Sequence, residues 1–151
     1  MKANLENHAR ELADKFSNRI KKIDYNNNEI HFNLRKLNDI PAICDHVYCN
    51  LNARLATIIC SDENKNGSGF VIRYVFEKDD VFIFIVSSTG QNGSSFPSIA
   101  LNIPAATLYE REIKDMFGLI PIGNPDTRPL ILHEHWPDGI FPLRKEFELK
   151  T

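Results

Sequence analysis

The residues GFVIRYVFE at 69–77, followed by KDD at 78–80 and VFIFIVS at 81–87, decide the fold of this chain. Both longer runs are rich in β-branched and aromatic residues, and the polar residues between them are typical of a turn, so they predict two paired strands. A third run of the same kind occupies residues 55–61, before a polar turn at 62–68. Together the three runs predict a β-meander.

The N-terminal residues, 4–34, predict a helix followed by a hairpin. Apolar residues at steps of three and four indicate a helix over residues 4–17, and the side chain of Asn4 is expected to cap it. Residues 29–34 alternate apolar and polar side chains after three successive asparagines, a residue that tolerates the backbone of tight turns. We therefore expect strands at 19–25 and 29–34.

One further helix is predicted on each side of the meander. Asp39 is a candidate capping carboxylate and Pro41 lies in the first turn, so a helix is expected there, with an apolar stripe that reaches Leu51. Residues 104–117 form the other predicted helix, and Gly118 is a typical residue at which a helix ends.

Composition excludes several classes of protein. The 151 residues suit one domain, with 42% apolar and 25% charged residues as in ordinary globular proteins. A net charge of −2 lacks the basic footprint of a nucleic-acid binder. No apolar run approaches the ~20 residues that span a bilayer, and we expect no secretory signal at the polar N-terminus. Three cysteines without disulfide spacing favour a reducing, cytoplasmic compartment.

The segment after Gly118 has a different composition, because it contains five prolines within 22 residues. Proline removes backbone donors and opposes helices and central strands, so this segment is predicted to be extended. It is also rich in apolar residues, and we expect it to lie on a partner rather than on the domain alone. The sequence thus predicts an α+β protein: a two-layer domain over 1–118, with a mixed sheet of about five strands packed with helices, and a proline-rich tail over 119–151.

The cysteines are weak candidates for a metal site. Cys44, His46 and Cys49 are close in sequence, but on an α-helix only His46 and Cys49 share a face. Compact zinc sites take four ligands, and Cys60 supplies no matching pair. We therefore interpret the cysteines as small buried apolar residues.

Two histidines in the tail form a second candidate metal site. His133 and His135 would point the same way in an extended chain, and Asp126 or Asp138 is a candidate third ligand. The simpler interpretation, which we prefer, is that these histidines form hydrogen bonds that anchor the tail.

The predicted helix at 104–117 carries a charged cluster. Glu110 and Lys114 are four residues apart, as are Arg111 and Asp115, and opposite charges at this spacing are expected to pair along a helix. Paired carboxylates, here with Glu112, can perform acid–base catalysis. A solvated helix face or an interface clamp is the simpler interpretation. The sequence shows neither a readable Ser–His–Asp set nor a glycine-rich phosphate loop.

Three motifs nevertheless resemble a known family. They are YEREIKDMFG at 109–118, Pro-Asp at 125–126 and Pro-Leu-Arg-Lys at 142–145. In combination they resemble the signature of the 30 kDa subunit family of respiratory complex I, which includes a homologous subunit of membrane-bound NiFe hydrogenases. The stretch PLILHEHWP at 129–137 is similar to the hydrogenase branch. Asn124 departs from the pattern, which more often has histidine before Pro-Asp.

The resemblance implies a non-catalytic structural subunit of an energy-converting hydrogenase of the formate hydrogenlyase type. It implies that this chain carries no flavin, cluster or nickel, and that iron–sulfur clusters and, in that branch, a NiFe centre lie in partner subunits. The implied partners are a large catalytic-type subunit and an iron–sulfur small subunit, with membrane subunits contacted indirectly. This hetero-oligomer would lie at the cytoplasmic face of the membrane, where electron transfer and ion pumping belong to the complex.

The same resemblance implies that the helix at 104–117 and the tail clamp the large subunit. Trp136, Phe141 and Leu143 would be anchors, and Arg144 and Lys145 would pair with carboxylates of that subunit. The full set of expected partner-interface residues is Tyr109, Glu110, Arg111, Glu112, Asp115, Phe117, Asp126, Arg128, His133, His135, Trp136, Phe141, Leu143, Arg144 and Lys145.

Three alternatives remain open at this point. In the first, the chain is the same subunit in a complex I-type dehydrogenase that uses NADH, ferredoxin or F420. It would otherwise be a stand-alone metalloprotein that uses His133, His135 and an aspartate, or a regulatory module that docks through its tail.

Overall fold

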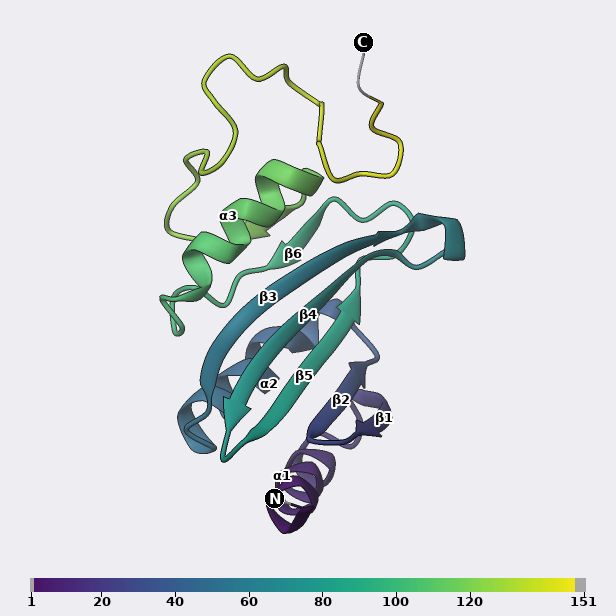
Figure 1. Ribbon diagram of the computed structural model, residues 1–151, viewed down its shortest axis with the longest axis vertical. Coiled ribbons are helices and arrows are strands. Elements are labelled where there is room, and N and C mark those ends of the chain that lie inside the picture. Colours follow the sequence, from purple (N-terminus) through teal and green to yellow (C-terminus); the bar gives the residue numbers. More distant parts are fainter. Residues whose placement is uncertain (1, 149–151) are drawn as a thin grey trace.

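The computed structural model describes residues 2–148 as an α+β domain with three α-helices and seven strands in that range (Figure 1). The helices are α1 (Lys2–Lys15), α2 (Ile40–Asp45) and α3 (Ala106–Phe117). The strands are β1 (Ile20–Asn26), β2 (Glu29–Leu34), β3 (Arg54–Glu63), β4 (Gly69–Lys78), β5 (Val81–Ser88), β6 (Ser95–Pro97) and β7 (Ile120–Ile122). Short 3₁₀ turns occupy Leu37–Asp39 and Asn64–Asn66, and a π-helical turn occupies His46–Asn50.

Five strands form a mixed sheet in the order β1-β2-β5-β4-β3. The predicted meander is confirmed, because β3 pairs with β4 and β4 with β5, both antiparallel. The predicted hairpin of β1 and β2 is also confirmed. Strand β2 lies parallel to β5 and joins the two units, which makes the sheet mixed as expected.

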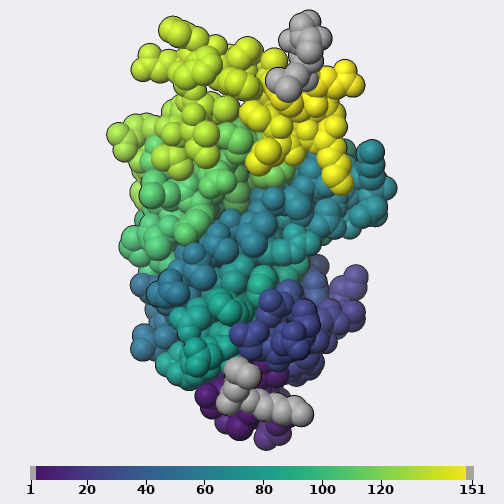
Figure 2. Space-filling model, in the orientation of Figure 1, coloured from purple at the N-terminus to yellow at the C-terminus, as the bar shows by residue number. Residues whose placement is uncertain are grey.

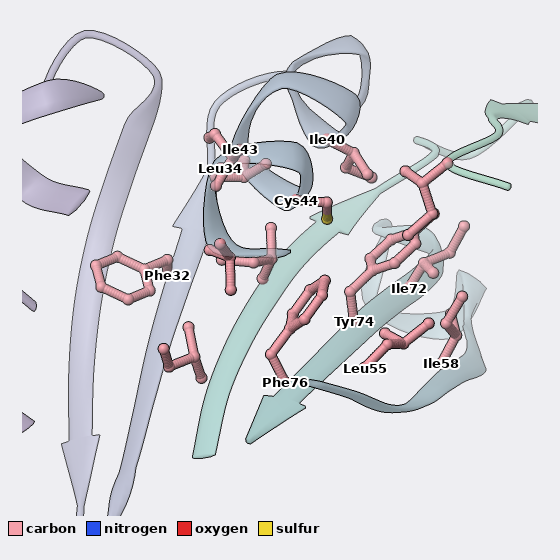
Figure 3. Packing of buried hydrophobic residues seen from close by; sticks show 14 of the residues in the cluster. Phe32, Leu34, Ile40, Ile43, Cys44, Leu55, Ile58, Ile72, Tyr74 and Phe76 are labelled. Atoms are coloured by element: carbon pink, nitrogen blue, oxygen red, sulfur yellow. The ribbon is translucent and has the colours of Figure 1, made fainter. Parts of the chain in front are cut away.

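The hydrophobic core lies on the face of the sheet that α1 and α2 cover. Figure 3 shows side chains of β2, β4 and β5 gathered beside Ile40, Ile43 and Cys44 of α2. Tyr74 and Phe76 of β4 are fully buried there. Burying an apolar side chain such as that of Phe76 contributes roughly 1.5–3 kcal/mol to the stability of the fold.

The structure corrects three predictions about helix ends. Helix α1 begins at Lys2, so Asn4 lies inside the helix and does not cap it. The side chain of Asp39 makes no capping hydrogen bond, and it lies 3.6 Å from Arg19 instead. The stripe that reaches Leu51 does not continue as an α-helix, because the helix ends at Asp45 and a π-helical turn follows.

Helix α3 lies beside the edge strand β3, and the tail leaves from its end (Figure 1). Gly118 ends α3 with a positive φ of 72°, a backbone conformation in which a Cβ is disfavoured. Leu119 then enters the core, and β7 pairs in parallel with β6 in a small second sheet that the sequence did not predict. The first residues of the tail are therefore packed on the domain itself, and the division at Gly118 stays a prediction about independent folding.

Among the described residues, none of the helices combines the length and the apolar character that crossing a membrane would require.

Candidate functional site

Helix α3 is fixed against the sheet by its apolar side and by one tyrosine. Ile113 and Phe117 are buried in the core, and the hydroxyl of Tyr109 donates a 3.0 Å hydrogen bond to the carbonyl of Ala56 on β3. This bond occupies a backbone acceptor of the edge strand. Most of the charged residues that the sequence singled out on this helix are also buried.

Glu110 lies at the centre of the α3 contacts and is fully buried, with 0% of its surface exposed. Its carboxylate accepts hydrogen bonds from the hydroxyl of Ser98 at 2.6 Å, from the backbone N–H of Ile99 at 2.8 Å and from the side-chain amide of Asn124 at 2.8 Å. Burial raises the pKa of Glu110, and the three donors oppose that shift. Glu110 thus joins α3 to the segment after β6 and to the tail.

Arg111 holds the next part of the tail. Its guanidinium donates to the carbonyls of Arg128 at 2.8 Å and Pro129 at 3.0 Å, and to the carboxylate of Asp126 at 3.0 Å. Asp126 also accepts hydrogen bonds from the side chain and the backbone of Arg128. These bonds, led by the one from the Arg128 side chain, hold the pKa of Asp126 well below its usual range.

Asp115 binds three successive backbone N–H groups. One carboxylate oxygen accepts from Leu130 at 2.9 Å, from Ile131 at 2.8 Å and from Leu132 at 3.2 Å. Consecutive N–H groups that converge on one oxygen form a concave anion site, here occupied by the chain's own carboxylate. Asp115 therefore fixes the turn that leads into the rest of the tail.

These contacts correct the prediction of charge pairs along the helix. In residues 2–148, Glu110 makes no ion pair with Lys114, and Arg111 makes none with Asp115. A solvated helix face is likewise wrong for Glu110, Arg111 and Asp115, which are buried, whereas Glu112 is exposed. The contact of these residues with a partner subunit stays a prediction.

The PLRK motif at 142–145 fastens the far end of the tail. The N–H of Leu143 donates to the carbonyl of Met116 at 3.1 Å, and the guanidinium of Arg144 donates to that of Phe117 at 2.7 Å. The N–H of Lys145 donates to the carboxylate of Asp62 at 2.9 Å. Pairing of Arg144 and Lys145 with carboxylates of another subunit stays a prediction.

The tail therefore forms an arch, residues 133–141, that is held at both ends (Figure 1). The indole N–H of Trp136 donates to the carbonyl of Ile140 at 2.7 Å and closes the turn of the arch. A hollow of about 390 Å³ lies between the arch and the end of α3. Figure 2 shows the tail at one end of the molecule, opposite α1.

Exposed apolar side chains gather on this part of the chain. Of the 11 large apolar side chains that are exposed in the described residues, eight lie between positions 101 and 143. They are Leu101, Leu108, Ile120, Ile122, Leu130, Ile131, Ile140 and Leu143. Of these, only Leu143 was among the expected interface residues; the alternation of Ile120 and Ile122 around buried Pro121 is a period-two signal that could have indicated the other face of a strand.

In the described residues, neither candidate metal site has a set of side chains that could hold an ion. The described residues contain no group of three or more His, Cys, Asp and Glu side chains placed to hold a metal ion. His133 accepts a hydrogen bond from the N–H of His135, and both side chains are exposed. Cys44 is buried as predicted, whereas Cys49 is exposed, and burial raises the pKa of the partly buried Cys60 to about 12.

Comparison with known proteins assigns the chain to a family. The model of the family described as respiratory-chain NADH dehydrogenase, 30 Kd subunit, matches residues 34–151. The chain belongs to this family. The match includes α3, the arch and the PLRK motif, so it covers all the contacts described above.

Two relatives of this chain are hydrogenase-type proteins. Formate hydrogenlyase subunit 5 of Escherichia coli (strain K12) is 34% identical over 114 residues, which are 74% of this chain and 20% of that protein. Hydrogenase-4 component G of the same organism is 32% identical, with the same coverage. The chain thus spans about a fifth of these relatives. A subunit of the NADH-quinone oxidoreductase of Chlorobium phaeobacteroides is 42% identical over 60 residues, which are 40% of this chain and 35% of that protein.

Two solved structures share the fold. A trypsin-resistant fragment of Nqo5 has a TM-score of 0.67 at 20% identity, over 81% of this chain and 98% of that one. A chain of the membrane-bound sulfane sulfur reductase, an archaeal respiratory membrane complex, has a TM-score of 0.72 at 18% identity, over 96% of this chain and 86% of that one. The predicted α+β architecture is that of this family.

Proposed function

We propose that this chain is a non-catalytic structural subunit of a membrane-bound, hydrogenase-type respiratory complex, and that it clamps the large catalytic subunit with α3, β7 and the tail. The observation that carries the proposal is the gathering of exposed apolar side chains on these segments. Ile120 and Ile122 share one face of β7, and Ile120 and Ile140 line the same hollow, so several of these side chains lie close together, as at an interaction site. Membership of the 30 kDa family supports the kind of complex that we propose, a membrane-bound respiratory one.

The buried charged residues of α3 support this surface by holding the tail in place. Glu110, Arg111 and Asp115 hold the tail on the chain's own helix, so the exposed apolar side chains of the tail have a fixed arrangement before any partner binds. Ordering an interface beforehand reduces the entropy lost on association. The tail thus acts as a prearranged docking surface, and the signature helix positions it.

The hydrogenase branch is favoured over the NADH dehydrogenase branch by the extent of similarity. Similarity to the two hydrogenase-type relatives extends over 74% of the chain, whereas similarity to the NADH-quinone oxidoreductase protein extends over 40%. In this proposal the iron–sulfur clusters and the NiFe centre belong to partner subunits. The small iron–sulfur subunit is a second neighbour, membrane subunits are indirect ones, and the assembly lies at the cytoplasmic face.

The experiment is a gentle detergent purification through an N-terminal tag, with copurifying chains identified by mass spectrometry and nickel and iron measured in the same sample. A nickel-containing large subunit with membrane subunits supports the proposal. Flavin- or NADH-handling subunits without nickel move the chain to the NADH dehydrogenase branch. A lone monomer refutes both.

Matched variants test the proposed surface in the same purification. Ile120→Ser and Ile122→Ser change side chains that are 52% and 60% exposed, so the fold should persist while retention in the complex falls. Loss of an interface anchor typically costs ~2 kcal/mol or more, roughly 30-fold in affinity. Tyr25→Ser is the control, because Tyr25 is 57% exposed and belongs to β1, which lies away from the tail (Figure 1). Equal retention of all three variants contradicts the location of the surface.

A further inference from the structure

The last part of the tail curls around a second concave surface. Residues 136–148 line a hollow of about 630 Å³, and its apolar walls come from Trp136, Ile140, Phe141 and Phe147. Aromatic side chains offer large contact area with few rotatable bonds, and they are frequent anchors of protein interfaces. We refer to this hollow as the aromatic groove.

The aromatic groove is built by internal contacts of the tail. The guanidinium of Arg144 lies 4.6 Å from the ring centre of Phe141 and 5.1 Å from that of Phe70, and it donates to the carbonyl of Phe117. The N–H of Phe147 donates to the carbonyl of Arg144 at 3.0 Å. The walls of the groove are therefore fixed to α3 and to the sheet.

The rim of the aromatic groove is acidic. Glu146 and Glu148 line it, and the side chain of Glu146 is 76% exposed. Arg144 is the basic residue of the lining: its guanidinium lies on two aromatic rings, donates to the carbonyl of Phe117 and pairs with the carboxylate of Glu146 at 3.4 Å. Glu134 and Asp138 add two further carboxylates on the neighbouring arch. Lys145 is exposed beside Glu146, so the negative charge about the apolar hollow comes mainly from Glu148, Glu134 and Asp138, which form no ion pair within the described residues, and from the exposed part of Glu146.

We propose that the aromatic groove binds a basic segment of the partner subunit, in which an apolar side chain enters the hollow and flanking Lys or Arg residues face Glu146 and Glu148. The proposal rests on the proposed function, because the groove belongs to the same tail. Complementary charge at a rim selects the partner and speeds association, and burial of the apolar side chain supplies affinity. The acidic rim disfavours an anionic lipid surface or a nucleic acid as the occupant.

The test uses the intact complex, purified through an N-terminal tag. A carbodiimide, which joins carboxylates to amines without a spacer, is applied to the wild-type complex, and cross-linked peptides are identified by mass spectrometry. We expect Glu146 or Glu148 joined to a lysine of another subunit. Cross-links from these residues only to this chain's own lysines overturn the proposal.

Charge reversal provides the second arm. The double variant Glu146→Lys/Glu148→Lys is expected to lower retention in the complex about tenfold at moderate salt, with a smaller loss for Glu146→Gln/Glu148→Gln. The control is Glu6→Lys/Asp14→Lys, which makes the same charge change at exposed sites on α1, at the other end of the molecule.

The outcomes separate the two proposals. If the wild-type chain copurifies with the complex and the double variant is retained as well as the control, the groove proposal is wrong and the proposed function stands. If the wild-type chain purifies alone, the proposed function fails as well. Thermal unfolding of each free variant, expected within a few degrees of wild type because both glutamates are exposed, identifies any loss caused by misfolding.

Discussion

Replacing Asp115 with alanine is the sharpest test of how the tail is held. The change removes one oxygen that accepts three backbone N–H groups, at 2.9, 2.8 and 3.2 Å. Hydrogen bonds to a charged group contribute about 1.5–3 kcal/mol each, but the three share one acceptor, and water can reach the freed groups of the exposed Leu130 and Ile131. We therefore expect a loss of about 3 kcal/mol, well below the sum of three separate bonds.

The loss should appear as local opening of the tail. A change of about 3 kcal/mol corresponds to roughly a 100-fold higher population of the open tail, since 1.4 kcal/mol is tenfold. Hydrogen exchange of the amides of residues 130–132, measured by mass spectrometry on the free protein, should accelerate by that factor while the amides of β4 stay protected. Asp115→Asn keeps one oxygen acceptor without the charge, and its acceleration should be about tenfold.

The control is Glu112→Ala, which removes an exposed carboxylate from the same helix. It should leave exchange in the tail unchanged. The reasoning is refuted if Asp115→Ala and Glu112→Ala give the same exchange at residues 130–132. If Asp115→Ala unfolds the whole chain, the graded effect of Asp115→Asn carries the test.

Three further predictions concern the same contacts. Gly118→Ala should destabilise the protein in urea more than Gly139→Ala: both positions have positive φ, but only at Gly118 would a Cβ meet an aromatic ring of the tail. Asn124→Asp places a second carboxylate beside buried Glu110, so the pKa of one of the two carboxyl groups rises above its unfolded value. We expect the variant to lose ~2 kcal/mol or more of stability at pH 7, and thermal unfolding should show that this loss shrinks as pH falls toward 4. Burial acts to raise the pKa of Asp62, but hydrogen bonds from Lys145 and Asn64 lower it overall. The stabilisation by Asp62 is thus present above pH ~4 and lost below, so proteolysis of residues 143–148 should increase near pH 3, but not in Asp62→Asn.

The sequence alone was sufficient for most of the secondary structure, because that information is local. The β-branched and aromatic runs at 69–77 and 81–87 pair as predicted, and the alternation at 29–34 gives β2. Apolar periodicity records which side of an element is buried, and no distant residue is needed to interpret it. The errors at Asn4 and Asp39 arose where a residue type suits a cap but the helix began elsewhere or the side chain took another partner.

The partners of the buried charges were decided only by the tertiary structure. Spacing along α3 predicted that Arg111 would pair with Asp115, because they share a helix face, yet each binds the tail 15 to 18 residues further along. A buried charge must be matched by hydrogen bonds, and which groups supply them depends on the path of the chain after Gly118. That path is set by Leu119 in the core and by the pairing of β7 with β6; local alternation can indicate a strand at 120–122, but not the distant strand with which it pairs. The sequence determined the elements and the charged residues, and the return of the tail over α3 decided what those residues bind.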